Sequence, residues 1–243
     1  MSAPASRSLS PEYATSTLPR PLVAVDVVAF ALRDGALSTI LVRRGLAPFA
    51  GKWALPGGFV LPKEALEVAA RRELTEETGA HIRSSYVEQL YTFGDPRRDP
   101  RGRVISVTYL ALLAASDDVH LRGGSDAADA QWWPVAALPH LAFDHDAIIA
   151  YAVQRLRYKL EYTNIMFALL PDRFTFGELQ SSYEWILGKP FDKRNFRKKI
   201  GTLGFVRPTS EWRRPEQGRP ARLWRFDRRE LVQVKTFVAK ATH

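Results

Sequence analysis

The order of hydrophobic and polar residues predicts a first half built mainly of strands. Apolar runs over residues 22–32 and 38–43 are short and rich in Val, Ala and Leu, and Asp34-Gly35 between them is typical of a turn. We expect further strands over residues 86–93, 104–114 and 128–133. A polar loop with four arginines, residues 94–103, separates the first two of these.

One amphipathic helix interrupts this strand pattern. Small and apolar residues recur at three- and four-residue spacing, which predicts a helix over about residues 65–78: Leu66, Ala69, Ala70 and Leu74. Gly79 falls just past its end, where a left-handed cap suits glycine. Because Pro56, Gly57 and Gly58 mark a tight turn, the local order is strand, glycine loop, helix.

The second half has a helical rhythm that ends in a basic hairpin. A helix starting near His145, with Asp144 as N-cap, is expected to run to about Leu160. The expected elements that follow are helices over 162–170, 176–187 and 193–204, the last capped by Asp192, then strands over 205–208 and 221–226. This order is typical of a winged helix-turn-helix.

Length and composition indicate two globular domains. The chain has 243 residues, 46% of them hydrophobic, which exceeds one domain of about 100–150 residues. We expect a disordered tail over 1–20, a first domain over 21–154 and a second over 155–243. With no cysteine and no apolar run of about 18 residues, the chain has no disulfide and no membrane span, and we expect a cytoplasmic protein.

Charge separates the two halves. Residues 155–243 hold 20 Lys and Arg against 9 Asp and Glu, a net of +11, whereas residues 1–154 hold 15 against 17, a net of −2. A strongly basic half joined to a nearly neutral one predicts that the basic half binds a polyanion.

Three carboxylates share one face of the predicted first helix. Glu73, Glu76 and Glu77 stand at i, i+3 and i+4, where like charges repel. A hard divalent cation, Mg²⁺ or Mn²⁺, would offset that repulsion. The alternative is a solvated acidic face paired with Arg71 and Arg72.

The full pattern around these glutamates resembles the Nudix box. Its charged and glycine positions are all filled: Gly58, Glu64, Arg72-Glu73-Leu74, Glu76-Glu77 and Gly79. Only Ala80 departs, because a larger aliphatic residue is usual there. The resemblance implies an α+β protein with a Nudix α/β/α sandwich. It also implies that Glu73, Glu76 and Glu77 bind metal and that Arg72 orients a glutamate.

The resemblance leaves hydrolysis open. Arg72, Glu76 and Glu77 are the candidate catalytic residues of an active or a vestigial site, in which metal-activated water attacks a diphosphate. The base that accepts the proton would be a box glutamate or a loop carboxylate such as Asp95 or Asp99.

Residues flanking the box are candidates for holding a nucleotide. Arginines suit a diphosphate, although surface ion pairs are the alternative for each: Arg43, Arg44, Arg98, Arg101 and Arg103. Gly58 belongs to the same loop. Phe49, Trp53 and Phe93 are candidates to stack adenine, with packing in the core as the alternative. His145 is expected to contact ligand or to stabilise the start of its helix.

The basic residues of the second half concentrate on two adjacent elements. In a winged helix the third helix enters the major groove, and here it carries Lys193, Arg194, Asn195, Arg197 and Lys198. The hairpin adds Arg213, Arg214, Arg219 and Arg222, which suit phosphate or guanine. A solvated basic face is the alternative.

Most of the chain after residue 20 resembles the Nudix-related transcriptional regulators, the NrtR family. The matching pieces are LVRRGLAPFAGKWALPGGFV at 41–60, DPRGRVISVTYLAL at 99–112, LAFDH at 141–145, RLRYKLEYTNI at 155–165 and GRPARLWRF at 218–226. The resemblance implies a homodimeric repressor of NAD-biosynthesis genes that binds palindromic double-stranded operator DNA and is released by ADP-ribose or a related nucleotide.

Two other functions compete with this interpretation. The intact box also suits a Mg²⁺-dependent ADP-ribose pyrophosphatase with an accessory C-terminal domain. An RNA-processing Nudix enzyme is the third hypothesis, and a preference for capped or structured RNA over duplex DNA would distinguish it.

Overall fold

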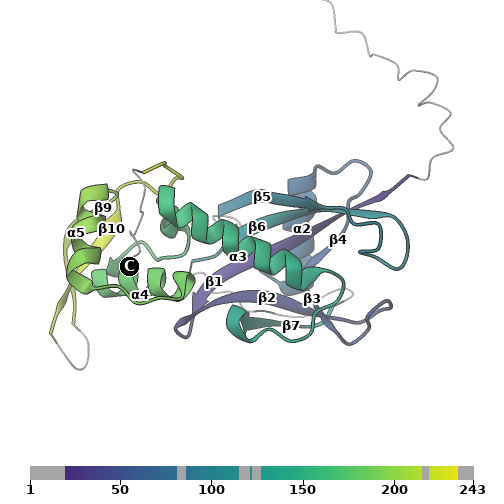
Figure 1. The fold of residues 1–243 in the computed structure, drawn as a ribbon, viewed down its shortest axis with the longest axis horizontal. Helices are drawn as coiled ribbons and strands as arrows, with labels where there is room; N and C mark the ends of the chain where they lie inside the picture. The colour runs from purple at the N-terminus through teal and green to yellow at the C-terminus, as the bar shows by residue number, and fades with distance from the viewer. Residues whose placement is uncertain (1–19, 81–85, 115–120, 122–126, 215–218, 235–243) are drawn as a thin grey trace, which may run out of the picture.

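The computed structural model describes residues 20–80, 86–114, 121, 127–214 and 219–234. Its first half is one mixed sheet with a helix on each face (Figure 1). The strands are β1 (Leu22–Arg33), β2 (Ala36–Arg44), β3 (Trp53–Ala54), β4 (Gly57–Phe59), β5 (Tyr86–Phe93), β6 (Val104–Leu112) and β7 (Ala127–Pro134). The helices are α2 (Leu66–Thr78) and α3 (His145–Tyr162), with a 3₁₀ turn, η1 (Val135–Ala137), between β7 and α3.

Strand β1 is the centre of the sheet. It pairs in parallel with β6 from Leu22 to Phe30 and antiparallel with β2 and β4, and the main strand order is β3-β2-β1-β6-β5. Strand β7 pairs with β2. The glycine loop therefore places β4, and α2 after it, directly beside β1.

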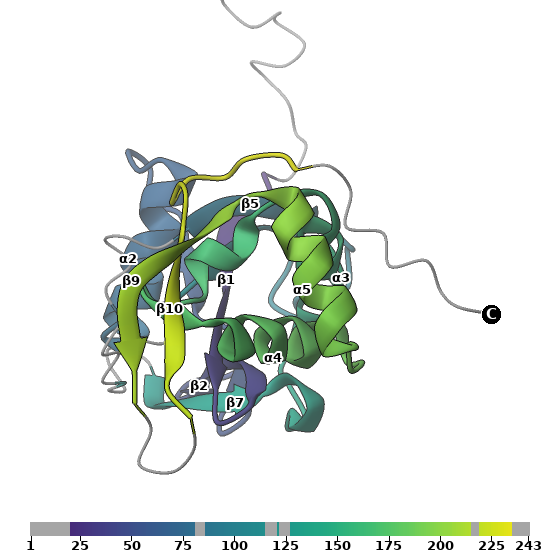
Figure 2. The ribbon, with the colours of Figure 1, turned by 90° about the vertical axis from the view of Figure 1, so that its left-hand side faces the viewer.

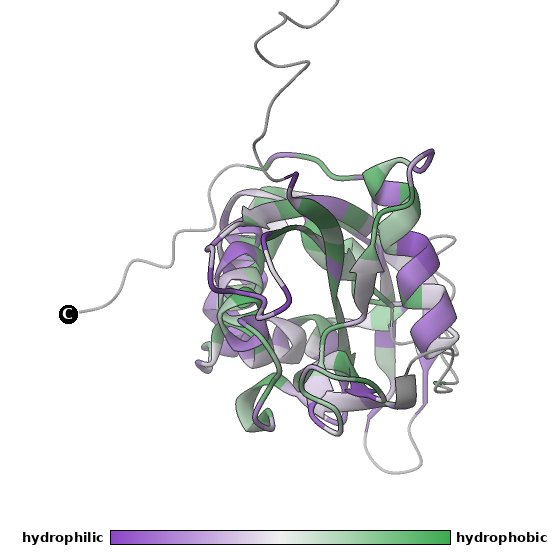
Figure 3. Cartoon of the chain, turned by 90° about the vertical axis from the view of Figure 1, so that its right-hand side faces the viewer, coloured by the Kyte–Doolittle hydropathy of each residue, from purple (hydrophilic) through white to green (hydrophobic). Residues whose placement is uncertain are grey.

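Alternate residues of β1 bury opposite faces of the sheet. Val25, Val27 and Ala29 pack under α2 with its small residues Ala69 and Ala70. The intervening residues Val28, Phe30 and Leu32 pack under α3. Because helices cover both faces, the strand is apolar almost throughout. In Figure 3 the strands are accordingly largely green, while the outer surfaces of the helices carry purple, hydrophilic residues.

The second half forms a smaller unit at the left-hand end of the molecule in Figure 1, and Figure 2 shows this end facing the viewer. It contains the 3₁₀ turn η2 (Ile165–Ala168), α4 (Phe176–Leu187) and α5 (Lys193–Leu203), with a sheet of order β8-β10-β9. Its strands are β8 (Phe174–Thr175), β9 (Val206–Arg213) and β10 (Ala221–Phe226). The last two predicted helices and the hairpin after them are confirmed.

Two expected elements of the second half differ from the structure. The helix expected over 162–170 is absent: α3 ends at Tyr162, and only the 3₁₀ turn η2 follows. The segment is apolar because it is buried, with Ile165, Met166 and Leu169 completely inaccessible. Strand β9 also extends to Arg213, well past the expected end at 208, because it pairs with β10.

Helix ends follow their sequence signals with one exception. Gly79, Gly188 and Gly204 end their helices in the left-handed conformation, and Asp192 accepts a hydrogen bond from the backbone N–H of Asn195 at 2.8 Å. Asp144 is the residue before α3, but its side chain does not cap that helix. The carboxylate binds Arg98 instead.

Helix α3 runs through the predicted domain boundary at 154/155. Its buried residues belong to one hydrophobic cluster that also contains Phe30 of β1 and Phe174 and Tyr183 of the C-terminal half. The Arg157 Nε donates to the Ile186 carbonyl of α4 at 2.8 Å. The two halves are therefore joined by a rigid, packed element. The expected tail over 1–20 lies outside the described residues apart from Arg20.

Because the two halves share one hydrophobic core, we predict that a single substitution in α3 destabilises both of them. Leu156 is completely buried. We expect Leu156→Ala to lower the free energy of unfolding by about 2–5 kcal/mol, because it removes apolar contacts and leaves a cavity. Because the core is continuous, urea unfolding followed by tryptophan fluorescence should shift as one transition.

Tyr158 on the same helix supplies the control. Its side chain is 53% exposed, so Tyr158→Ala should change stability by less than about 0.5 kcal/mol. A Leu156→Ala protein that unfolds in two steps, with only one of them shifted, would contradict a continuous core.

Candidate functional site

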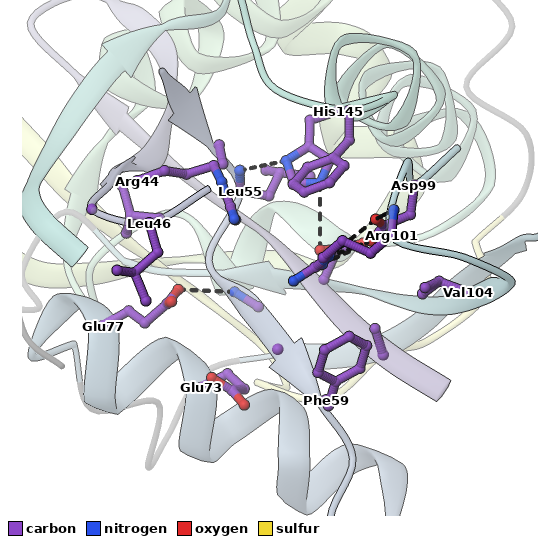
Figure 4. A pocket seen from close by; sticks show the side chains of 18 of the residues that line it. Arg44, Leu46, Leu55, Phe59, Glu73, Glu77, Asp99, Arg101, Val104 and His145 are labelled. Carbon is purple, nitrogen blue, oxygen red and sulfur yellow. Dashed lines mark hydrogen bonds and ion pairs between the residues drawn. The ribbon is translucent and has the colours of Figure 1, made fainter. Parts of the chain in front are cut away.

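A pocket of about 290 Å³ opens between α2, the carboxyl end of β2 and the N-terminus of α3. Its wall comes from segments far apart in the sequence (Figure 4). Acidic residues of α2 line one side, and arginines from β2 and from the loop before β6 line another: Glu73, Glu77, Arg43, Arg44, Arg98 and Arg101. The sequence separates these residues by up to 58 positions, and only the fold brings them together.

Glu77 reaches back from α2 to the glycine loop. Its Oε2 accepts a hydrogen bond from the backbone N–H of Gly57 at 3.0 Å. Burial raises the pKa of Glu77 to about 8, and the nearby charges of Glu73 and Asp26 add to the increase. Position 57 must be glycine, because a Cβ there would collide with the backbone carbonyl oxygen of Val25, and a Cβ at Gly58 would displace the Glu73 carboxylate.

Arg72 organises the other carboxylates of the predicted box. Its guanidinium binds Glu64 at 2.7 and 2.9 Å, Glu73 at 2.7 Å and Glu76 at 3.1 Å. The bond to Glu64 is the main reason that the pKa of Arg72 is raised. Arg72 therefore positions glutamates, as the box pattern implies.

The carboxylates fit a divalent cation in chemistry but do not converge. Within the described residues, no three acidic or histidine side chains meet around one point that could hold a metal. Glu76 is half exposed and turned to Arg72, whereas Glu73 and Glu77 face the pocket. Burial raises the pKa of Glu73 as well as that of Glu77. Two half-buried carboxylates with raised pKa values are oxygen donors that Mg²⁺ would stabilise in the ionised form.

A buried ionic cluster forms the floor of the pocket. Arg98 donates two hydrogen bonds to Asp144, at 2.7 and 3.0 Å, and one to Asp26 at 3.2 Å. Asp26 also accepts a hydrogen bond from the Ser106 hydroxyl. Arg98 is only 8% exposed, so its charge is held by these partners. The cluster joins β1, the loop before β6 and the start of α3.

His145 adds a hydrogen bond between α3 and the loop after β3. The backbone N–H of Leu55 donates to its Nδ1 at 2.8 Å, and its Nε2 lies 3.5 Å from Asp26. Burial lowers the pKa of His145, so the imidazole is neutral at physiological pH. His145 was expected either to contact ligand or to stabilise the start of its helix. It is the first residue of α3, and it also lines the pocket.

Two arginines stand over the ring of Phe143. The guanidinium of Arg44 lies 4.8 Å and that of Arg101 5.7 Å from its centroid. Arg101 is paired with Asp99 at 2.7 Å, but Arg44 has no carboxylate within ion-pair distance in the described part of the chain. Burial and the charge of Arg101 lower the pKa of Arg44. An anion between the two would relieve this repulsion.

The pocket includes some of the predicted ligand residues and excludes others. Arg43, Arg44, Gly58 and Arg98 line it. Trp53 instead packs edge-on against Trp133 at 5.4 Å, and Arg103 donates to the Gly94 carbonyl at 2.6 Å outside the pocket. The prediction of both residues rests on their nearness in sequence to the box, which does not fix the direction of a side chain.

The aromatic residues that are candidates for stacking adenine also differ in their distance from the pocket. Phe49 packs edge-on against Phe143 at 4.9 Å, next to the pocket, whereas Phe93 packs with Tyr91 and Tyr151 away from it. Phe59 and Phe143 are the aromatic rings that line the pocket. Of the two loop carboxylates considered as a base, Asp99 lines it and Asp95 does not.

Sequence reasoning missed Phe143 and Asp26. Phe143, two residues before the start of α3, has a positive φ of 55°, and its ring lies next to Arg44 and Arg101. Asp26 is the one acidic residue in the apolar strand β1. An acidic residue in such a run is rarely buried without a specific role, and this was the sequence signal that could have identified it.

The third helix presents its basic residues to solvent, as its pattern predicts. Phe196 and Ile200 are buried, and Lys193, Arg194, Asn195 and Lys198 are exposed. Arg197 is exposed as well, but its guanidinium lies 4.9 Å from the Phe176 ring and 5.9 Å from the Trp224 ring. Arg197 thus packs along the side of the helix, towards the wing, rather than on its outermost face.

The wing arginines differ in their partners. Arg213 binds Glu178 at 2.5 Å, and Arg222 donates to the Thr209 carbonyl at 2.6 Å. Arg214 and Arg219 are exposed on either side of the tip. Two of the four predicted wing contacts are therefore engaged within the protein itself.

Comparison with known proteins covers both halves of the chain. The pattern of the NUDIX domain family matches residues 21–156, and that of the NrtR DNA-binding winged helix domain matches residues 166–226. An ADPR responsive transcriptional repressor, NtrR, of Acinetobacter baylyi is 36% identical over 219 residues, which cover 88% of this chain and 86% of the relative.

Solved structures show the same likeness. Shewanella oneidensis NrtR complexed with a 27mer DNA is 37% identical, with a TM-score of 0.72 over 84% of this chain and 93% of that one. The NUDIX domain of the same S. oneidensis protein, complexed with ADP ribose, is 36% identical, with a TM-score of 0.52 over 60% of this chain and 96% of that one.

The raised pKa of Glu77 predicts a dependence of stability on pH. Its value of about 8 lies above the 4.5 of an ordinary glutamate, so the folded protein holds this proton where the unfolded chain has lost it. Stability should therefore fall as pH rises from about 4.5 to 8. In chelator, Glu77→Gln should gain about 2–4 kcal/mol over wild type at pH 8 and less than about 1 kcal/mol at pH 5.

Thermal unfolding at the two pH values checks this. Glu67→Gln is the matched control, because Glu67 lies on the same helix, is exposed and is paired with Arg71. At pH 8, Mg²⁺ should raise the melting temperature of wild type and of the control but not that of Glu77→Gln. A Glu77→Gln protein that is equally destabilised at both pH values would show that the carboxylate is ionised and satisfied without metal.

Proposed function

Because this chain belongs to the Nudix-related transcriptional regulator (NrtR) family, we propose that it is an ADP-ribose-responsive transcriptional repressor. As a cytoplasmic homodimer it binds palindromic operator DNA at NAD-biosynthesis genes, and nucleotide bound in the Nudix pocket releases it. The observation that carries this proposal is one chain with a cationic helix at one end and a nucleotide-sized pocket at the other.

DNA binding is supported by the chemistry of α5 and the wing. The outer face of α5 is basic and free of acidic residues after its Asp192 cap, and both elements lie at the end of the molecule shown in Figure 2. A cationic helix of this size fits the major groove, and the wing lies beside it for phosphate contacts. The S. oneidensis relative was solved with DNA, which agrees with this assignment.

Effector binding is supported by the arginines of the pocket. Arg44 and Arg101 both lie close to the ring of Phe143, and Arg44 lacks a carboxylate partner in the described residues. A diphosphate between them would supply the missing counter-charge through charge-assisted hydrogen bonds. The pocket that these arginines line also contains Phe59 and Phe143, flat surfaces for a base or ribose.

Helix α3 couples the two sites. Its first residues, with Asp144 before them, are held to the pocket floor by Arg98 and Leu55, and its far end packs in the core of the winged helix. A diphosphate that attracts Arg98 weakens its bond to Asp144 and so changes the position of α3. The DNA-binding end then moves with the helix, because the two share one core.

Hydrolysis of ADP-ribose is the second candidate function. The observation that favours it is that Glu64, Arg72, Glu73, Glu76 and Glu77 are all present and that Arg72 organises three of them. Glu73 and Glu77 would hold Mg²⁺, which would activate water and neutralise the diphosphate. This activity is compatible with repression if turnover is slow, because the bound nucleotide remains the signal.

The repressor proposal predicts DNA binding that responds to nucleotide. We expect tight binding to DNA upstream of NAD-biosynthesis genes, with a steep salt dependence, and release by ADP-ribose in chelator. Fluorescence anisotropy with and without Mg²⁺ measures this. Release in chelator shows that hydrolysis is not required. No preference for these promoters over random duplex, together with Mg²⁺-dependent turnover, would establish the enzyme instead.

The pocket proposal predicts a variant that no longer responds to nucleotide. We expect Arg44→Ala to weaken ADP-ribose binding by about tenfold or more, because a charge-assisted contact is lost, and to leave DNA affinity unchanged. Calorimetry and DNA-release titrations measure the two effects. Arg71→Ala removes a guanidinium outside the pocket and is the control. Equal ADP-ribose affinity in both variants would move the diphosphate away from Arg44.

A further inference from the structure

Gly201 occupies an unusual position in α5. It lies inside the helix, two residues before its end at Leu203, with backbone angles that any residue adopts in a helix. It is exposed, and a Cβ built there meets nothing within 4 Å. Alanine is markedly more favourable than glycine at such a position, so the glycine weakens the helix.

Four other glycines of the protein have a reason within the chain, whereas Gly177 in the first turn of α4 has none among the described residues. Gly188 and Gly204 end helices with a positive φ, and Gly57 and Gly58 lie where a Cβ would collide with a neighbour. Gly201 has neither reason in the part of the chain that the structure describes. Its missing side chain therefore leaves space for something outside the chain.

The neighbours of Gly201 show what would use that space. It follows Arg194 by seven residues and Lys198 by three, so the three lie on one face of α5 at about 100° per residue. Phe196 and Ile200 occupy the opposite, buried face. The glycine thus lies on the solvent side of the helix, between Lys198 and Arg197, and the guanidinium of Arg197 packs towards the wing.

We propose that Gly201 is the point where the backbone of α5 makes its closest approach to DNA inside the major groove. The inference rests on the proposed DNA-binding function. A bare backbone lets the helix lie deeper in the groove, so that Arg194 on the same face reaches base edges while Lys198 meets a backbone phosphate. A side chain at 201 would keep the helix away from the bases while leaving phosphate contacts of the wing in place.

The test compares specific with non-specific binding. The probes are a duplex that full-length wild type selects from a random-sequence pool and a scrambled duplex of the same composition. We expect Gly201→Ala to weaken binding to the selected duplex by about tenfold and binding to the scrambled one by less than about twofold. The loss should grow for Gly201→Leu. The melting temperature of Gly201→Ala should equal or exceed that of wild type, because alanine favours the helix.

Two further variants separate this inference from the function on which it rests. Lys198→Ala should weaken binding to both duplexes and reduce the salt dependence by about one ion, whereas Lys63→Ala, on the exposed loop before α2, should change neither. If Lys198→Ala has no effect and no duplex is selected, DNA binding itself fails. If Lys198→Ala weakens binding but Gly201→Ala does not, or Gly201→Ala weakens both duplexes equally, the close approach in the groove is wrong.

Discussion

The packing of α3 is the constraint on which the rest of the structure depends. Its apolar stripe covers one face of the Nudix sheet and continues into the core of the winged helix, with Leu156 and Leu160 buried where the two halves meet. A buried pair between Lys159 and Glu88 of β5, at 2.8 Å, holds the same helix from the side. Because burial of this one stripe stabilises both halves, the position of α3 sets the position of the DNA-binding end relative to the pocket.

The pocket is built from charges that the fold keeps apart. Glu73 and Glu77 stand on one wall, the arginines on another, and the cluster of Arg98, Asp26 and Asp144 fixes the floor. Each set is incomplete by itself, because the carboxylates carry raised pKa values and Arg44 lacks an anionic partner in the described residues. A nucleotide diphosphate with a divalent cation is complementary to both sets at once. This complementarity supports sensing and slow hydrolysis alike.

The DNA-binding end shows how an excess of positive charge is distributed among different tasks. Arg213 and Arg222 bind acceptors of the protein itself, and Arg197 lies over aromatic rings, so a count of basic residues overstates the number aimed at DNA. The outer face of α5 remains, where Lys193, Arg194 and Lys198 are exposed. Because the winged helix shares its hydrophobic core with α3, the orientation of this face depends on the position of α3.

The sequence by itself determined the local elements and the chemistry of the box. Strand alternation, the period of α2, the Gly79 cap and the spacing of Glu73, Glu76 and Glu77 are read within a few neighbouring residues, so short-range rules suffice. Tertiary structure alone decided which side chains share a pocket: it excluded Trp53 and Arg103, admitted Phe143 and Asp26, and turned Asp144 from a helix cap to Arg98. Those outcomes depend on contacts between segments distant in the chain, and the direction of a side chain there is set by packing that no local pattern contains.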